Sequence, residues 1–212
     1  SPPPHIAGGI DRLRDPCAPA LVGVFQVVVG VIIVADARIA PGVQSETRIP
    51  ADAGSVVSYF NRESAAVRGG FNVASVFVPL QADPNICRSG ETPLACEFRA
   101  VRPSIVLISM ETGFEGRTAA VYEKYMRQII EYALEQGALP ILATKADNFE
   151  GDHSINLTTA KLAVEYDLPL WNFWRAVQPL PNHGMDITRP DGFHISVDAW
   201  RERSISSLRA LD

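Results

Sequence analysis

The sequence predicts an α/β fold, in the form of a three-layer α/β/α sandwich around a central, mostly parallel sheet. The first observation behind this prediction is a set of short runs rich in Val, Ile and Leu, which are typical of strands buried on both faces. The second is that helical patterns alternate with these runs, as they do in parallel sheets covered by helices on both faces. The length of 212 residues suits one such domain.

The individual elements follow from local patterns. The clearest helix is expected at 117–136, because Val121, Tyr125 and Ile129 repeat along one apolar face. Gly137 then ends the helix, as a glycine just past a helix C-terminus commonly does. Strands are expected at 21–37, 101–110, 139–143 and 168–173, and further helices at 55–62, 155–166 and 196–211.

Composition sets the domain organisation and excludes some partners. Residues 1–20 are rich in Pro and Gly and indicate an extended arm, whereas 21–212 indicate a single domain with an internal loop at 40–54. The 19 basic and 24 acidic residues give a net charge of −5 without a basic cluster, which argues against nucleic acid or an anionic membrane surface as partner. No apolar run reaches the ~18–20 residues of a membrane-spanning helix.

The chain has three cysteines. Cys87 and Cys96 flank a short polar loop, and a disulfide between them would close a loop of about ten residues, worth about 2–3 kcal/mol in the chain-entropy model. The alternative is two reduced thiols. If the bridge forms, the compartment is oxidising and the protein is expected to be extracellular. Cys17 is then the odd thiol, either buried or available for intermolecular pairing.

Asp191 and His194 are the best candidates for chemistry. Ligands of open parallel sheets bind beyond the carboxyl ends of the strands, so polar residues in the connecting turns are the first to consider. Asp191 and His194 lie three residues apart around Gly192, where a carboxylate can orient an imidazole and favour its protonated form, as a general base requires. The alternative is a surface turn that caps the last helix.

Several motifs together resemble those of the SGNH or GDSL hydrolases, and more closely a secreted bacterial subgroup. The segment 191–194, Asp-Gly-Phe-His, is similar to that family's Asp-x-x-His block, 60–70 to its second block and 102–109 to the strand before its third. The resemblance covers about residues 20–205 and implies an SGNH-hydrolase-like, flavodoxin-like fold. It also implies that Asp191 and His194 form a catalytic pair and that the backbone N–H of Gly70 contributes to an oxyanion hole.

The sequence departs from the family at two positions. The best match to the Gly-Asp-Ser nucleophile block is Ala35-Asp36-Ala37, so the resemblance puts Ala37 where the nucleophilic serine is expected. Gly113 stands at the position of the oxyanion asparagine. Loss of one oxyanion donor typically costs about 10²–10³ in rate, and loss of a serine nucleophile about a millionfold.

These departures predict an SGNH-hydrolase-like domain without serine-esterase chemistry, which binds a ligand or assembles with copies of itself. A second hypothesis is an active carboxylic-ester or acetyl-ester hydrolase, in which Asp36 replaces the nucleophile or His194 activates a water. Alternatively, Asp36 has a structural role and holds the loop in place, as the family resemblance implies. A third hypothesis is a glycan-binding module that uses an exposed ring of Trp171 or Trp174.

No cofactor is expected, and the partners considered are a carbohydrate or ester ligand and a second copy of the chain. His183 and Asp186, taken with Asp191 and His194, lack the close spacing of a metal site, so no metal is assigned. The segment that holds Asp147, Asp152 and His153 is expected to be a solvated loop, and 156–158 match an N-glycosylation sequon.

Overall fold

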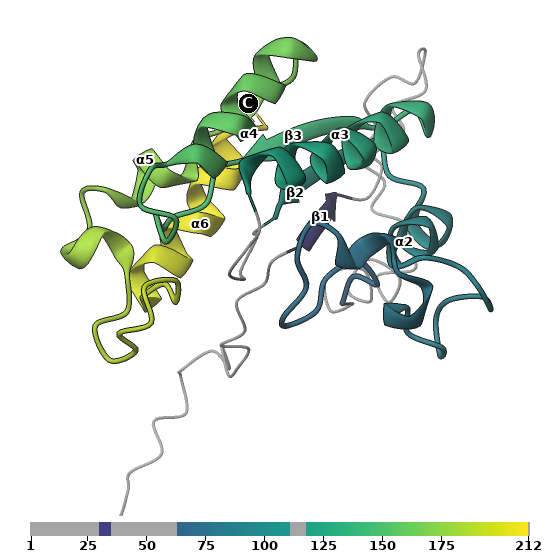
Figure 1. Ribbon diagram of the computed structural model, residues 1–212, viewed down its shortest axis with the longest axis horizontal. Helices are drawn as coiled ribbons and strands as arrows, with labels where there is room; N and C mark the ends of the chain where they lie inside the picture. Colours follow the sequence, from purple (N-terminus) through teal and green to yellow (C-terminus); the bar gives the residue numbers. More distant parts are fainter. Residues whose placement is uncertain (1–29, 35–62, 111–117, 212) are drawn as a thin grey trace, which may run out of the picture.

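The computed structural model describes residues 30–34, 63–110 and 118–211 (Figure 1). Within these ranges a four-stranded sheet has the order β1 (Gly30–Val34), β2 (Ile105–Ser109), β3 (Leu139–Ala143) and β4 (Leu170–Trp171). Strands β2, β3 and β4 run parallel to one another. The predicted mostly parallel sheet is therefore confirmed.

The first strand is the exception, because β1 runs antiparallel to β2. Gly30 lies opposite Ser109, and Val34 lies opposite Ile105. The apolar run predicts a parallel strand here, and that prediction is wrong for β1. A continuous apolar run indicates burial and not direction, and antiparallel edge strands are common on otherwise parallel sheets.

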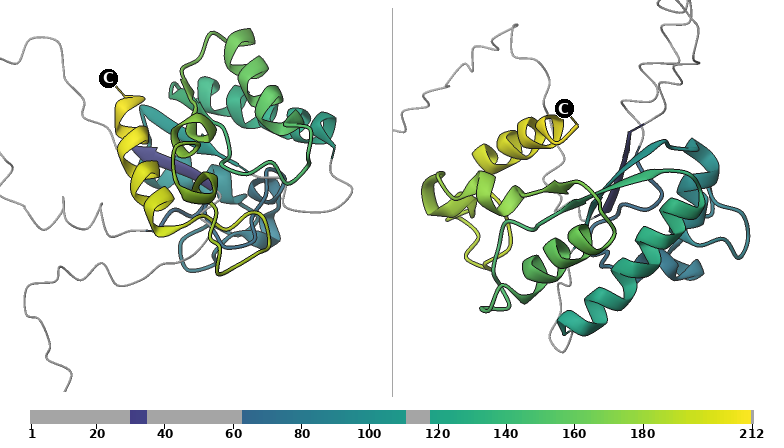
Figure 2. Two further views of the ribbon diagram at one scale, coloured as in Figure 1. Left: turned by 90° about the vertical axis from the view of Figure 1, so that its left-hand side faces the viewer. Right: turned by 90° about the horizontal axis from the view of Figure 1, so that it is seen from above.

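Helices cover both faces of the sheet, which gives the predicted three layers (Figure 2). One face packs against α2 (Pro93–Val101), α3 (Ala119–Glu135) and α4 (Ser154–Glu165), and the other against α5 (Phe173–Val177) and α6 (Val197–Arg209). The alternation of side chains along β2 shows the division. Val106 and Ile108 join the core under α3 and α4, whereas Leu107 joins the core under α5 and α6.

The long helices start and end close to their predicted limits, and two of them begin at a capping side chain. Thr118 caps α3 by accepting a hydrogen bond from the N–H of Val121, and Ser196 caps α6 by accepting one from the N–H of Ala199. Two short helices were not predicted. Helix α2 begins with a capping Thr92 followed by Pro93, which are typical signals of a helix start. Because α2 ends at Val101, the strand predicted at 101–110 begins at Ile105.

The second unpredicted helix shortens the last strand. Asn172 accepts a hydrogen bond from the N–H of Arg175 and thereby starts α5, so the expected strand at 168–173 is reduced to Leu170–Trp171. Single 3₁₀ turns occupy Ser75–Phe77, Pro79–Gln81 and Pro181–Gly184. The predicted arm at 1–20, the loop at 40–54 and the helix at 55–62 lie outside the described residues, so the domain limits stay predictions. No helix in the described ranges combines the length and apolar character needed to cross a bilayer.

Cys87 and Cys96 form the predicted disulfide, with their Cα atoms 5.2 Å apart. It ties the loop before α2 to the first turns of that helix. The same loop is held by Glu91, which accepts hydrogen bonds from the guanidinium of Arg99 and the backbone N–H of Arg88. These bonds lower the pKa of Glu91 to about 2. A disulfide of this kind is typical of proteins that fold in an oxidising compartment. Cys17 lies outside the described residues.

Candidate functional site

The structure forms the predicted pair of Asp191 and His194. The Nδ1 atom of His194 donates a hydrogen bond to Oδ2 of Asp191. The other carboxylate oxygen accepts the backbone N–H groups of His194 at 3.0 Å and Phe193 at 3.2 Å. One carboxylate therefore fixes both the backbone of the turn and the orientation of the imidazole ring.

The electrostatics of the pair suit a base. Partial burial alone would raise the pKa of Asp191, but the hydrogen bonds from His194 and Phe193 outweigh it and the pKa lies below its usual 3.8. Asp191 is therefore ionised at neutral pH and favours the tautomer with a proton on Nδ1 of His194. In the part of the chain that the structure describes, Nε2 of His194 has no hydrogen-bond partner, so it is free to accept a proton.

Backbone pairing holds this turn against α6. The N–H of Ser196 donates to the carbonyl of Gly184 at 2.8 Å, and the N–H of Asp186 donates to the carbonyl of His194 at 2.9 Å. Met185 and Ile195 form an antiparallel bridge between these two bonds. Ser196, and not Asp191, caps α6, so the alternative of a turn that caps the last helix holds for its serine.

Two exposed aromatic rings, Phe193 and then Phe149, extend from the histidine. The ring centroid of Phe193 lies 4.6 Å from that of His194, and Phe149 meets Phe193 edge to face at 6.4 Å. Phe149 is 62% exposed and Phe193 is 37% exposed. The sequence analysis did not single out Phe149. The signal available in the sequence was that Phe149 follows shortly after the strand that ends at Ala143. Because Phe149 contacts Phe193, the Asp191–His194 turn lies at the carboxyl edge of β3.

The loop that carries Phe149 contains a buried ion cluster. The Nζ atom of Lys145 lies 2.5 Å from Oδ1 of Asp147 and 2.5 Å from Oε2 of Glu150. Burial would lower the pKa of Lys145, but the two carboxylates outweigh it and raise that pKa above its usual value. The expectation of a solvated loop is wrong for Asp147, because its charge is paired with that of Lys145 and can be buried.

Asn156 anchors the same loop. Its side-chain oxygen accepts the backbone N–H of Lys145 at 2.8 Å, and its amide donates to the Lys145 carbonyl at 3.1 Å. The side chain is buried. The sequon at 156–158 is therefore not accessible to a glycosylating enzyme in the folded protein.

The two tryptophans of the glycan hypothesis differ in their burial. Trp171 is 2% exposed, and its Nε1 donates to the hydroxyl of Ser206 at 2.9 Å. Phe173 is also buried. Trp174 is partly exposed and contacts the ring of His153 edge to face at 5.4 Å. A carbohydrate platform on Trp171 is therefore excluded, and Trp174 is the remaining tryptophan of that hypothesis.

Of the predicted nucleophile and oxyanion positions, Gly70 lies in the described ranges. Gly70 is exposed, and across the described ranges no hydrogen bond, ion pair or ring contact joins it to Asp191 or His194. Asp36, Ala37 and Gly113 lie outside the described residues, so their roles stay predictions.

His183 and Asp186 do not converge on a common point. The ring of His183 bonds the carbonyl of Gln178, whereas Asp186 bonds the backbone and hydroxyl of Thr188. Among the described residues, potential metal ligands gather at Cys87, Glu91 and Cys96, where both sulfurs are already joined in the disulfide.

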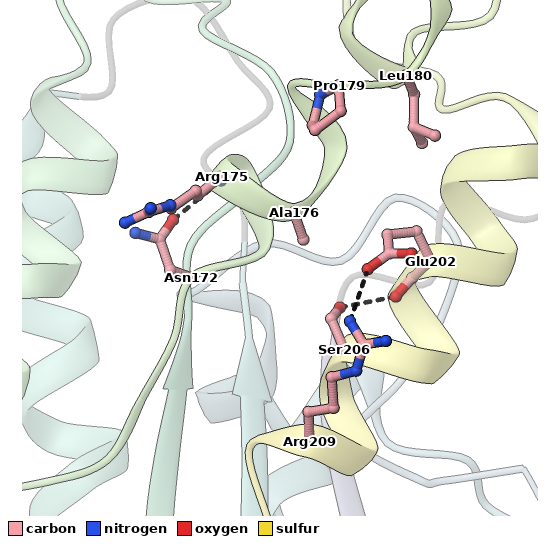
Figure 3. A pocket seen from close by; sticks show the side chains of 8 residues that line it. All are labelled: Asn172, Arg175, Ala176, Pro179, Leu180, Glu202, Ser206 and Arg209. Atoms are coloured by element: carbon pink, nitrogen blue, oxygen red, sulfur yellow. Dashed lines mark hydrogen bonds and ion pairs between the residues drawn. The ribbon is translucent and has the colours of Figure 1, made fainter.

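A hollow of about 470 Å³ opens between α5 and α6, and none of the predicted site residues line it (Figure 3). The acidic and hydroxyl groups that line the hollow are paired. Oε1 of Glu202 lies 3.9 Å from a guanidinium nitrogen of Arg209, and the backbone carbonyl of Glu202 accepts the hydroxyl of Ser206. The lining residues are Asn172, Arg175, Ala176, Pro179, Leu180, Glu202, Ser206 and Arg209.

Three solved structures share part of this fold. A GDSL-like lipase from Bacteroides thetaiotaomicron aligns with a TM-score of 0.46 and 14% identity, over 56% of this chain and 66% of its own. A putative GDSL-like lipase from Parabacteroides merdae aligns with a TM-score of 0.43 and 16% identity, over 54% of this chain and 62% of its own. TesA aligns with a TM-score of 0.47 and 18% identity, over 56% of this chain and 68% of its own. At these values the likeness concerns the fold and not the activity. No protein-family model and no curated protein sequence matches the chain.

Proposed function

We propose that this protein is an SGNH-hydrolase-like domain that binds an ester-type ligand at the Asp191–His194 turn and has no acyl-serine chemistry. The observation that carries the proposal is the ordered pair, in which a carboxylate fixes an imidazole that is 26% exposed and whose Nε2 has no hydrogen-bond partner among the described residues. Ala37, at the position where the family resemblance expects the nucleophile, has no hydroxyl. The disulfide supports an extracellular location.

The ionised Asp191 favours a second candidate function, the hydrolysis of an ester by a water that His194 activates. In that reaction Nε2 of His194 takes a proton as the water oxygen attacks the ester carbonyl. The tetrahedral intermediate then expels the alkoxide, which receives the same proton from the imidazolium. Asp191 would stabilise the transient imidazolium charge without itself being protonated.

Hydrolysis of p-nitrophenyl acetate separates the two candidates. We expect the wild-type protein and His194→Ala to hydrolyse it at the same rate, and a fluorophosphonate probe to leave no label on any serine. Binding is then measured from the ring resonances of His194 during titration with 2-butanone, an ester analogue that cannot be hydrolysed. Saturable shifts without turnover support the proposal. Saturable turnover that His194→Ala abolishes would establish the second candidate.

Self-association and glycan binding are two alternative uses of a domain without acyl-serine chemistry. Light scattering coupled to size exclusion decides the first, because a monomer at high concentration excludes assembly. A glycan panel decides the second, and the variant to compare is Trp174→Ala, since Trp171 is buried in the core.

A further inference from the structure

We infer that Phe149 and Phe193 form the binding surface for the apolar part of the ligand, the acyl chain of an ester whose carbonyl faces His194. This inference rests on the proposed function and adds to it the class of ligand. It is carried by the juxtaposition of two exposed phenyl rings with the imidazole of His194 at one edge of the sheet.

The two rings make one continuous apolar surface beside the base. Phe193 lies between the other two rings, with its centroid 4.6 Å from that of His194 and 6.4 Å from that of Phe149. The backbone at Gly192 also approaches Phe149, because a Cβ atom at this position would lie 3.6 Å from Cδ2 of Phe149. Neither phenyl ring has a hydrogen-bonding group, so the surface suits hydrocarbon better than a hydroxylated ring.

The position of Phe149 is fixed by the loop that carries it. The backbone N–H of Phe149 donates to Oδ1 of Asp147 at 3.0 Å, and the same oxygen is paired with the buried Nζ of Lys145. Oε1 of Glu150 accepts the N–H of Ile155 at 3.3 Å, which joins the loop to α4. An exposed phenyl ring held on such a support is preorganised, so binding costs little conformational entropy.

The charges of the Lys145, Asp147 and Glu150 cluster are paired with one another, and this bears on the ligand chemistry. Lys145 is paired with Asp147 and Glu150, and all three side chains lie mostly below the surface. Phe149 is the exposed apolar side chain of this loop, and an anionic or cationic ligand would gain no counter-charge from the cluster. An uncharged acyl chain loses nothing by this arrangement and gains the burial of its methylene groups.

The test uses a series of methyl ketones, from 2-butanone to 2-octanone, which resemble the acyl part of methyl esters. Binding is followed from the backbone resonances of Gly192 and the ring resonances of His194, so no turnover is needed. In the wild-type protein we expect the affinity to rise about two- to fourfold for each added methylene. In Phe149→Ala and Phe193→Ala we expect this dependence on chain length to fall to about half or less.

Leu157→Ala is the matched control, because Leu157 on α4 is 65% exposed and makes no ring contact with the turn. It should retain the full dependence on chain length. Phe149→Leu keeps an apolar side chain and should retain part of it. Ketones that bind at His194 with an affinity independent of chain length, or equally well in Phe149→Ala, overturn this inference and leave the proposed function standing. Ketones that do not shift His194 at all overturn both.

Discussion

Substitution of Gly184 by alanine tests how the fold supports the Asp191–His194 turn. Gly184 has a φ of +80°, and a Cβ atom built on it would lie 2.9 Å from Cβ of Val177 and 3.1 Å from Cβ of Ala199. Both neighbours are fully buried in the core between the sheet, α5 and α6. Neither contact can be relieved by a rotamer change, because a Cβ atom is fixed by the backbone.

The cost in unfolding free energy has two parts. A side chain at positive φ costs roughly 1–2 kcal/mol, and an extra carbon in a packed core costs roughly 1–3 kcal/mol, so Gly184→Ala should lose roughly 2–5 kcal/mol in total. Gly137→Ala is the control, because Gly137 has a φ of +76° with no atom within 4 Å of the added carbon. It should lose only the first part, roughly 1–2 kcal/mol. The entropy that alanine removes from the unfolded chain is common to both variants and cancels in the comparison.

Urea unfolding followed by tryptophan fluorescence measures both variants. The carbonyl of Gly184 accepts the N–H of Ser196, two residues after His194, so Gly184→Ala should also shift the ring resonances of His194, whereas Gly137→Ala should not. Equal losses of stability in the two variants would refute the steric argument. A destabilised Gly184→Ala with unchanged His194 resonances would show that the turn does not depend on this docking point.

Three further predictions follow from the ion pairs and the disulfide. Lys145→Met leaves two carboxylates beside a buried position without their counter-charge and should cost about 3–5 kcal/mol of unfolding free energy, whereas Lys161→Met, at a 61% exposed side chain, should cost less than about 1 kcal/mol. Replacing Cys87 and Cys96 by serine should cost about 2–3 kcal/mol, and a reductant should have the same effect on the wild-type protein but none on the variant. Because the folded state lowers the pKa of Asp191, its stabilising contribution is present above about pH 4 and is lost as the pH falls through the lowered value; unfolding from pH 6 to 2.5 should show a shallower acid slope in Asp191→Asn.

The elements that were predicted correctly carry their information locally. Helix α3 has a regular apolar stripe, a capping threonine and a glycine after its end, and each signal lies within a few residues of the boundary it sets. Helices α2 and α5 also have capping residues, Thr92 and Asn172, but they are too short for a periodic pattern to be evident. The direction of β1 had no local signal, since pairing partners and not the apolar run decide it.

The same distinction holds for the site. Asp191 and His194 are three residues apart, so a single turn brings their side chains together and the sequence alone could predict their contact. Phe149 reaches the turn only through the folded sheet and the ion cluster around Lys145. A lysine followed two residues later by an aspartate is an ordinary surface pattern, and nothing in it indicates that the pair is buried.

The direction of β1 bears on the missing nucleophile. Val34 ends this strand opposite Ile105, at the amino end of β2, whereas Phe149 places the Asp191–His194 turn at the carboxyl edge of β3. The five residues of β2 separate these two edges by about 13 Å. This distance between the described end of β1 and the turn is a second reason, besides the alanine at position 37, to expect no acyl-serine chemistry.

The two reasons differ in what Ala37→Ser should do. If only the hydroxyl is missing, a serine at position 37 restores the nucleophile, and a fluorophosphonate should label it in a reaction that requires His194. If the strand direction decides, the added hydroxyl has no base beside it and stays unlabelled. Because the described end of β1 and the Asp191–His194 turn lie at opposite edges of the sheet, we expect no label. Labelling that disappears in the double variant with His194→Ala would show instead that the motif resemblance, and not the strand pairing, locates the site.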